Sequence, residues 1–182
     1  MKLGFLPFLM LFCLGATAQD SGILKTILKT YYQNEKVIVK DRTQLLFLYC
    51  EKPNNNEELY ETINQLKLKP DVTAALRKKV LSDKAPKNWI ADYADALPEE
   101  HPLRKKVNEC KQVEQFQEIQ KKSNLHYQRL LIIHKPLYID PAKALVKVVF
   151  YRTIEHNSGS VLLMEKENGA WIIRDKLNNW ST

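Results

Sequence analysis

The sequence contains little glycine and little cysteine, and these shortages exclude several kinds of site. Five glycines and three cysteines are present among 182 residues. No glycine-rich loop that could cradle a phosphate occurs, and neither an H-E-x-x-H nor an EF-hand pattern is found. The cysteines form no C-x-x-C pair and do not stand with histidines at the spacing of zinc ligands. We therefore predict no cofactor and no metal site.

The distribution of charge does not indicate a nucleic-acid partner. The formal charge is +7, with basic clusters at residues 77–79, 104–106 and 121–122. Between Arg77 and Lys122, however, eight acidic residues stand among eleven basic ones. Surfaces that bind nucleic acid segregate charge of one sign, whereas interleaved charge is typical of solvated helices.

The N-terminus has the pattern of a signal peptide. Lys2 is followed by an apolar run from Leu3 to Leu14, and then by Ala16-Thr17-Ala18, a small-x-small cleavage motif. About a dozen apolar residues are too few to cross a hydrocarbon core of about 30 Å. We predict that residues 1–18 are a cleavable signal peptide, cut between Ala18 and Gln19.

Two alternatives to cleavage are an uncleaved anchor and a lipid tether at Cys13. Phe12 is bulky for the position before a lipidated cysteine, which favours simple cleavage. The mature chain, residues 19–182, is then exported without a transmembrane segment, and its length suits a single domain with a substantial core.

Export changes the interpretation of the remaining cysteines. Cys50 and Cys110 stay in the mature chain, and an oxidising compartment permits a disulfide between them. Two buried free thiols are the alternative.

Residues 21–122 are predicted to be mainly helical. Ile23, Ile27 and Tyr31 stand at helical spacing, and Asn55 with Glu58 three residues later has the form of a capping box. Pro70 suits the first turn of a following helix. The expected helices cover about 21–32, 55–66, 70–80, 88–97 and 99–122, although the apolar spacing slips once within the last. Segments 36–41 and 43–51 indicate a strand or an extended connection.

From about residue 125 to 182 the apolar period changes to two, which predicts β-strands. Ala144, Val146, Val148 and Phe150 share one face of a strand, and Asn168-Gly169 is a strong hairpin signal. We expect a four-stranded antiparallel β-meander with the upstream amphipathic helices packed on it, which is an α+β domain of two layers. Trp171 and Trp180 are interpreted as packing residues, with Trp180 just beyond the last strand.

The C-terminal quarter resembles small exported proteins of Gram-negative bacteria, for which no activity is assigned. The resemblance lies in a Pro-hydrophobic pair, an Ala-Leu-Val strand, a Ser-Gly turn, a Lys-Glu-Asn-Gly-x-Trp hairpin and a closing Trp-Ser. In this sequence these are Pro136-Leu137, Ala144-Leu145-Val146, Ser158-Gly159, 166–171 and Trp180-Ser181. It implies a location in the periplasm or outside the cell. Sheets of this kind also occur in cystatin-like and NTF2-like domains.

The histidines do not form a recognisable catalytic site. His126 and His134 lie about 26 Å apart along an extended strand, and His101 precedes Pro102 in an acidic turn. Glu155, His156 and Ser158 stand together in one loop, but neighbours in sequence seldom have triad geometry.

Two functions remain open. The first is an exported, non-catalytic binding or interaction domain, whose helix–sheet cleft or exposed sheet edge meets a small molecule or a protein partner. The alternative is a small hydrolase with a site assembled from distant residues. A histidine hydrogen-bonded to a buried carboxylate in a cleft would favour the hydrolase.

Overall fold

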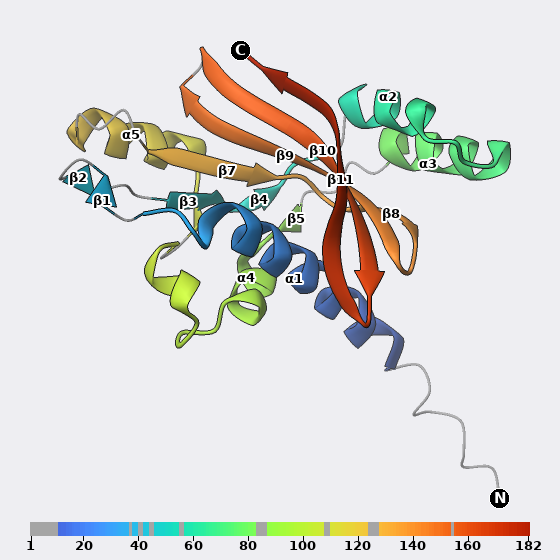
Figure 1. The fold of residues 1–182 in the computed structure, drawn as a ribbon, viewed down its shortest axis with the longest axis horizontal. Coiled ribbons are helices and arrows are strands. Elements are labelled where there is room, and N and C mark those ends of the chain that lie inside the picture. The colour runs from blue at the N-terminus through green and yellow to red at the C-terminus, as the bar shows by residue number, and fades with distance from the viewer. Residues whose placement is uncertain are drawn as a thin grey trace, which may run out of the picture.

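Helices lie on both faces of a twisted β-sheet in the computed structural model (Figure 1). The structure describes residues 11–36, 38–39, 42–43, 46–54, 57–82, 87–107, 110–123, 128–153 and 155–182. The helices are α1 (Leu11–Tyr32), α2 (Glu57–Gln65), α3 (Pro70–Ser82), α4 (Ile90–Ala96), η1 (Pro102–Lys105, a 3₁₀ helix) and α5 (Val113–Ser123). The predicted α+β class is confirmed.

The strands divide between one large sheet and two small ribbons. The large sheet contains β3 (Leu46–Tyr49), β6 (Cys110–Lys111), β7 (Arg129–Ile133), β8 (Leu137–Asp140), β9 (Lys143–Thr153), β10 (His156–Glu167) and β11 (Ala170–Ser181). The ribbons are β1 (Ile38–Val39) with β2 (Arg42–Thr43), and β4 (Glu51–Lys52) with β5 (Lys87–Asn88).

The sheet corrects the prediction of a four-stranded antiparallel meander. Its order is β11-β10-β9-β7-β3-β6, with β8 also paired to β9, so it has seven strands. The neighbours β9, β10 and β11 are antiparallel, but β3 is parallel to both β7 and β6. Segment 43–51 was predicted to be a strand or an extended connection, but the sequence did not show that β3 pairs with β7 about 80 residues later. Strand β6 lies inside a segment predicted to be helical, and its two residues are too few to show an alternating pattern. At the start of the predicted β region, the chain forms two short strands, β7 and β8, separated by residues 134–136.

The face that carries Val146 and Val148 is covered by α1 and α4. On α1, Ile23, Leu24, Ile27 and Leu28 are fully buried in this core. Tyr32, rather than the predicted Tyr31, completes the buried stripe, and its hydroxyl donates to the carbonyl of Phe47 at 3.2 Å. Helix α4 adds Tyr93 to this core, and the residues that flank the helix, Trp89 and Leu97, are buried there too.

The opposite face is covered too, so the domain is not limited to the two predicted layers. Helices α2 and α3 pack Leu59, Ile63 and Leu76 against Leu145 and Val161 of the sheet. Helix α5 packs on the same face farther along, with Phe116 at ring-centroid distances of 5.7 Å from Phe47 and 5.9 Å from Tyr151. Figure 1 shows α5 and the α2–α3 pair at opposite ends of the sheet.

The helix expected over residues 99–122 is wrong. The chain forms η1, turns into the short strand β6 and enters α5 only at Val113. Lys106, in the first part of this segment, caps the C-terminus of α1. Its ammonium donates to the carbonyl of Tyr32 at 3.4 Å and to that of Gln33, the next residue, at 2.5 Å. Backbone carbonyls at a helix C-terminus carry partial negative charge, so a lysine is a favourable cap.

The two C-terminal tryptophans both contact the body of the domain. Trp171 follows the turn at Asn168 and Gly169, which have φ angles of 50° and 81°, and its side chain is buried with Ile173 packed on the same core. Trp180 lies inside β11 rather than beyond it, and its ring lies over Gly159, where a Cβ would come within 2.6 Å.

Cys50 and Cys110 are joined by a disulfide with a Cα–Cα distance of 4.9 Å. The bond lies at the edge of the large sheet, because Cys110 pairs with Leu48 in the parallel β3–β6 ladder. It therefore fixes the outermost strand, which contributes only two residues to the sheet.

The predicted cleavage point between Ala18 and Gln19 lies within α1, which the structure describes from Leu11. Residues 1–10 of the predicted signal peptide lie outside the described residues, as do Asn55 and His126. Within the described chain, no helix combines the length and the apolar character that crossing a membrane requires.

Replacing both cysteines, in Cys50→Ala with Cys110→Ala, should lower the free energy of unfolding by about 4 kcal/mol, because the bond closes a loop of 60 residues. Urea unfolding of the variant and the parent protein measures the difference. The same loss is expected when the parent is unfolded with a reductant. Peptide mapping that finds either cysteine alkylated before reduction would contradict the bond.

Candidate functional site

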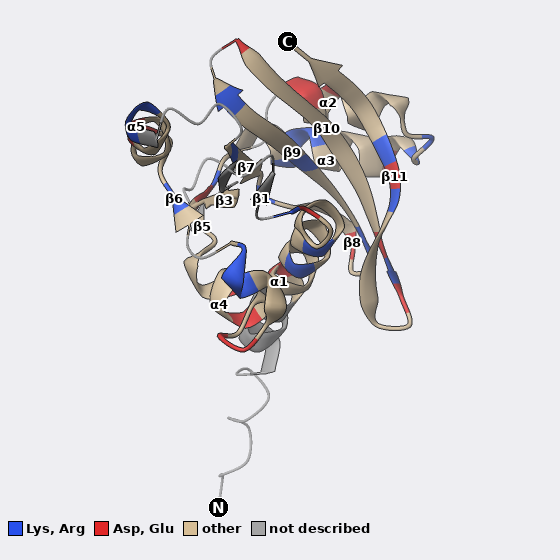
Figure 2. Cartoon of the chain, turned by 60° about the vertical axis from the view of Figure 1, so that its left-hand side comes forward, with Lys and Arg blue, Asp and Glu red and all other residues tan. Residues whose placement is uncertain are grey.

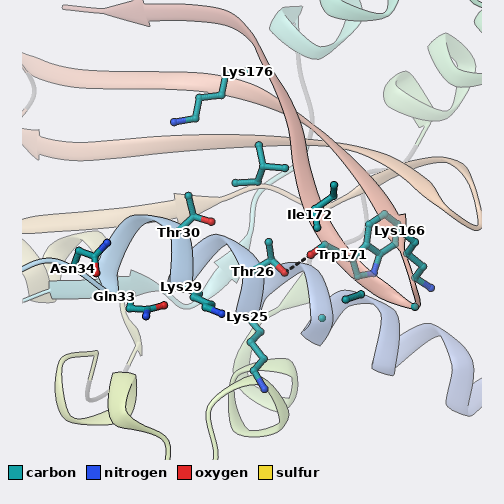
Figure 3. Close-up of a pocket in the computed structure, with 14 residues that line it drawn as sticks. Lys25, Thr26, Lys29, Thr30, Gln33, Asn34, Lys166, Trp171, Ile172 and Lys176 are labelled. Carbon is teal, nitrogen blue, oxygen red and sulfur yellow. Dashed lines mark hydrogen bonds between the residues drawn. The ribbon is translucent and has the colours of Figure 1, made fainter.

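A groove between α1 and β11 has a volume of about 990 Å³ (Figure 3). One wall is formed by a polar face of α1 and the turn that follows it, with Lys25, Thr26, Lys29, Thr30, Gln33 and Asn34. The other wall is the first half of β11, together with Lys166 from the end of β10. This volume is at the upper end of the range typical of small-molecule sites.

The groove is cationic. Lys25 and Lys29 come from α1, and Lys166 and Lys176 come from the hairpin, whereas the described lining contains no acidic residue. None of these four lysines has a carboxylate within 4.0 Å in the part of the chain that the structure describes. Figure 2 shows basic residues on both α1 and β11.

The hairpin glutamates do not neutralise the groove. Glu165 accepts from Lys143 at 2.8 Å and from Arg174 at 2.9 Å, and Glu167 is paired with the same arginine. The hydrogen bond and charge of Lys143 lower the pKa of Glu165, with Arg174 adding to the effect. These carboxylates are therefore bound to cations outside the groove lining, and the positive charge of the groove remains.

Aromatic rings hold two of the groove lysines in place. The Lys166 ammonium lies 5.0 Å from the ring centre of Trp171, and the Lys176 ammonium lies 4.9 Å from that of Tyr31. In Figure 3, Lys25 extends from α1 away from β11, so Lys29, Lys166 and Lys176 are the cations that border the strand. Cation–π contacts leave an ammonium free to donate hydrogen bonds to an anion.

Trp171 forms the floor of the groove and carries an unsatisfied donor. Its side chain is 6 % exposed, and its indole Nε1 is buried without a hydrogen-bond partner in the described structure. The ring reaches α1 because residue 22 is glycine: a Cβ there would lie 3.0 Å from Cδ1 of Trp171. A buried donor without an acceptor costs roughly 1–3 kcal/mol.

The backbone of β11 is tied to α1 beside this donor. Thr26 donates from its hydroxyl to the carbonyl of Trp171 at 2.9 Å (Figure 3). Glu167 and Ala170 flank the two-residue turn and form a hydrogen-bonded pair. Hydrogen-bonded and non-hydrogen-bonded pairs alternate in an antiparallel ladder, so the backbone N–H and carbonyl of the next residue, Trp171, point away from β10. The groove thus begins where α1 covers the sheet edge and continues toward Ile173 and Lys176.

A second polar site is buried around Asp20 of α1. The Lys52 ammonium contacts Asp20 and Asp92 at 2.6 Å each and lies 4.2 Å from the ring centre of Trp89. Tyr138 donates to Asp20. Burial raises the pKa of Asp92 although Lys52 opposes the shift, and burial with the Asp20 charge raises that of Tyr138. We call these four residues, without Trp89, the Lys52 cluster.

A third polar group lies on the opposite face of the sheet. Lys147 pairs with Glu58 at 2.7 Å, and the nearby His134 places Nδ1 3.0 Å from the carbonyl of Asn54. Burial and the Lys147 charge lower the pKa of His134 to about 4. Burial alone would raise the pKa of Glu58, but the Lys147 hydrogen bond and charge lower it. His134 is thus neutral and bonded to a carbonyl, not to a carboxylate.

The other predicted histidines are near the surface. His101 caps η1, accepting from the Leu103 amide at 3.2 Å. Glu155 and His156 border a cavity of about 500 Å³ beside α5, where His156 lies 3.1 Å from the hydroxyl of Thr153. Ser158 is not part of that lining and pairs within the sheet. The structure therefore does not bring Glu155, His156 and Ser158 together as a triad.

Among the described residues, no group of three or more histidine, cysteine, aspartate or glutamate side chains could hold a metal ion.

The sequence interpretation missed the groove, because its lysines are ordinary surface residues until the fold brings α1 beside the hairpin. The available signals were the i, i+4 spacing of Lys25 and Lys29 and the lysines on either side of the Asn-Gly turn.

Removing the cation of the Lys52 cluster, in Lys52→Met, should lower the free energy of unfolding by about 3–5 kcal/mol, because two largely buried carboxylates lose their counter-ion. Chemical denaturation measures the loss. The matched variant Lys79→Met, at an exposed position on α3, should change stability by less than about 0.5 kcal/mol. Equal losses of unfolding free energy in the two variants would show that the Lys52 cluster is exposed to solvent.

Lowering the pH from 7 to 5 should reduce the free energy of unfolding by about 2 kcal/mol through His134. Its folded pKa of about 4 lies below the unfolded value of 6.5, so in this window only the unfolded chain takes up the proton. Denaturant unfolding at the two pH values tests the slope. His134→Gln should remove this pH-dependent loss of stability, whereas the exposed control His156→Gln should retain it. An NMR titration that gives His134 a pKa near 6.5 would contradict the prediction.

Comparisons with known proteins do not place this chain in a family. No family model, no curated protein and no solved structure matches it. The resemblance of the C-terminal quarter to small exported proteins stays a prediction, and the function is inferred from the geometry and charge of the groove.

Proposed function

We propose that this protein is an exported, non-catalytic binding domain that takes an anionic ligand in the α1–β11 groove. The observation that carries the proposal is the unneutralised charge of the groove, formed by Lys25, Lys29, Lys166 and Lys176. A low-dielectric wall that carries charge of one sign concentrates oppositely charged molecules. The buried indole ring of Trp171 forms the floor of the groove.

The side chains of the groove support binding better than catalysis. The described lining offers ammonium groups, two threonine hydroxyls and the amides of Gln33 and Asn34. General acid–base catalysis most often uses a histidine or a carboxylate within hydrogen-bond reach of the substrate, and the described lining contains neither. His134, the most strongly shifted histidine, lies on the other face of the sheet against Asn54.

Export to the periplasm or the exterior of a Gram-negative cell is part of the proposal. The Cys50–Cys110 bond supports it, because disulfides persist in oxidising compartments and are rare in the cytosol. The signal-peptide pattern of residues 1–18 supports it independently.

Citrate, used as a simple carboxylate probe at low ionic strength, should bind the groove and shift the indole ¹H–¹⁵N signal of Trp171. The protein has three tryptophans, so the signals of Trp89 and Trp180 serve as internal references. Binding should weaken as salt is added, because the groove lysines are partly or fully exposed to screening. Glycerol and spermidine, which are neutral and cationic, should leave the Trp171 signal in place.

Lys166→Gln should weaken citrate binding severalfold, since this lysine lies over the Trp171 ring. The control Lys79→Gln removes the same charge from α3 and should have no effect. A Trp171 signal that does not respond to citrate, or that responds equally to spermidine, would contradict an anion-binding groove.

A further inference from the structure

We propose that the α1–β11 groove is the docking site for an extended acidic peptide segment of a partner protein. This inference rests on the proposed function, because it names the class of ligand that the same groove takes. It is drawn from the length of the groove, the spacing of its cations and the kind of polar groups between them.

The groove is long rather than round. From Gly22 to Tyr32, α1 extends by about 15 Å, and from Ala170 to Lys176, β11 extends by about 20 Å. An extended peptide advances by about 3.3–3.6 Å per residue, so five or six residues span this length. A compact anion would contact only one part of it.

The cations follow the length of the groove instead of converging on one point. Lys166 lies at the hairpin end over Trp171, whereas Lys176 reaches toward Tyr31 near the C-terminal end of α1 (Figure 3). Lys29 lies on α1 between these ends. Alternate residues of an extended peptide place their side chains on one side about 7 Å apart, so carboxylates at every second position can meet successive lysines.

The described lining lacks the loop that commonly cradles phosphate. Its two glycines, Gly22 and Gly169, lie on separate elements and form no glycine-rich run. All four cationic lining residues are lysines, which attract carboxylate and phosphate alike as point charges. The choice of a peptide therefore depends on the length of the groove and on the backbone groups along it.

Groups that suit a peptide backbone lie between the lysines. Thr30, Gln33 and Asn34 offer both donors and acceptors along α1 and the turn that follows it. Across the groove, Ile173 follows Trp171 by two residues, and the strand shows no bulge before it, so its backbone N–H and carbonyl have the same outward orientation. A peptide strand beside Ile173 would extend the sheet at β11, a known mode of peptide recognition.

The test uses the full-length protein with three probes. The first is an acetylated pentapeptide of alternating glutamate and alanine, with glutamate at positions one, three and five. The second is the same peptide with glutamine in place of glutamate. The third is inorganic tripolyphosphate, a linear polyanion without a peptide backbone. Binding is measured by the shift of the Trp171 indole signal and by isothermal titration.

The glutamate peptide should bind at least tenfold more tightly than the glutamine peptide and should shift the Trp171 signal. The double variant Lys29→Gln with Lys176→Gln should weaken it roughly tenfold. The matched control, Lys78→Gln with Lys79→Gln, makes the same change of charge on exposed residues of α3 and should bind as the parent does. Denaturant unfolding of both variants verifies that they remain folded.

Three outcomes separate the possibilities. Binding of the glutamate peptide that depends on Lys29 and Lys176 supports the inference. Binding of tripolyphosphate or citrate without binding of the glutamate peptide overturns it and leaves the proposed anion-binding function standing. Failure of every anion to shift Trp171 overturns both.

Discussion

The close contact between α1 and the β10–β11 hairpin determines the position of the α1–β11 groove. Gly22 allows the Trp171 ring to approach the helix, and Thr26 then ties the helix to the outward carbonyl of the same residue. At this point the edge of the sheet is covered. Farther along β11 the same two elements leave a groove, so the contact that buries the indole also sets the starting point and the direction of the site.

The buried lysines and the groove lysines differ in their partners. The Lys52 and Lys147 ammonium groups are buried with carboxylate partners, and removing either partner would leave a costly buried charge. The groove lysines have no such carboxylates among the described residues, and two of them lie over aromatic rings. The lysines at the two buried positions therefore stabilise the fold, whereas those of the groove are available to a ligand.

The sequence predicted the elements that have a long and regular pattern, and it failed where short segments depend on their neighbours. The stripe of α1, the helices that start near Glu57 and Pro70, and the alternation of β9 were all recognisable. Strand β3 lies in segment 43–51, for which the sequence indicated a strand or an extended connection. Strand β6 was not recognisable, because its two residues acquire strand geometry only from pairing with β3. The groove was missed for a similar reason: Lys29 and Lys176 are 147 positions apart and become neighbours only through the fold.

Asp20 lies close to the predicted cleavage point between Ala18 and Gln19. Its carboxylate contacts both Lys52 and Tyr138, yet the predicted processing point leaves it only one residue from the new amino terminus. An aminopeptidase that trimmed two residues would strip the buried ammonium of one of its two counter-ions. Cyclisation of Gln19 to pyroglutamate, which blocks such enzymes, would thus protect an ion pair in the interior as well as the chain end.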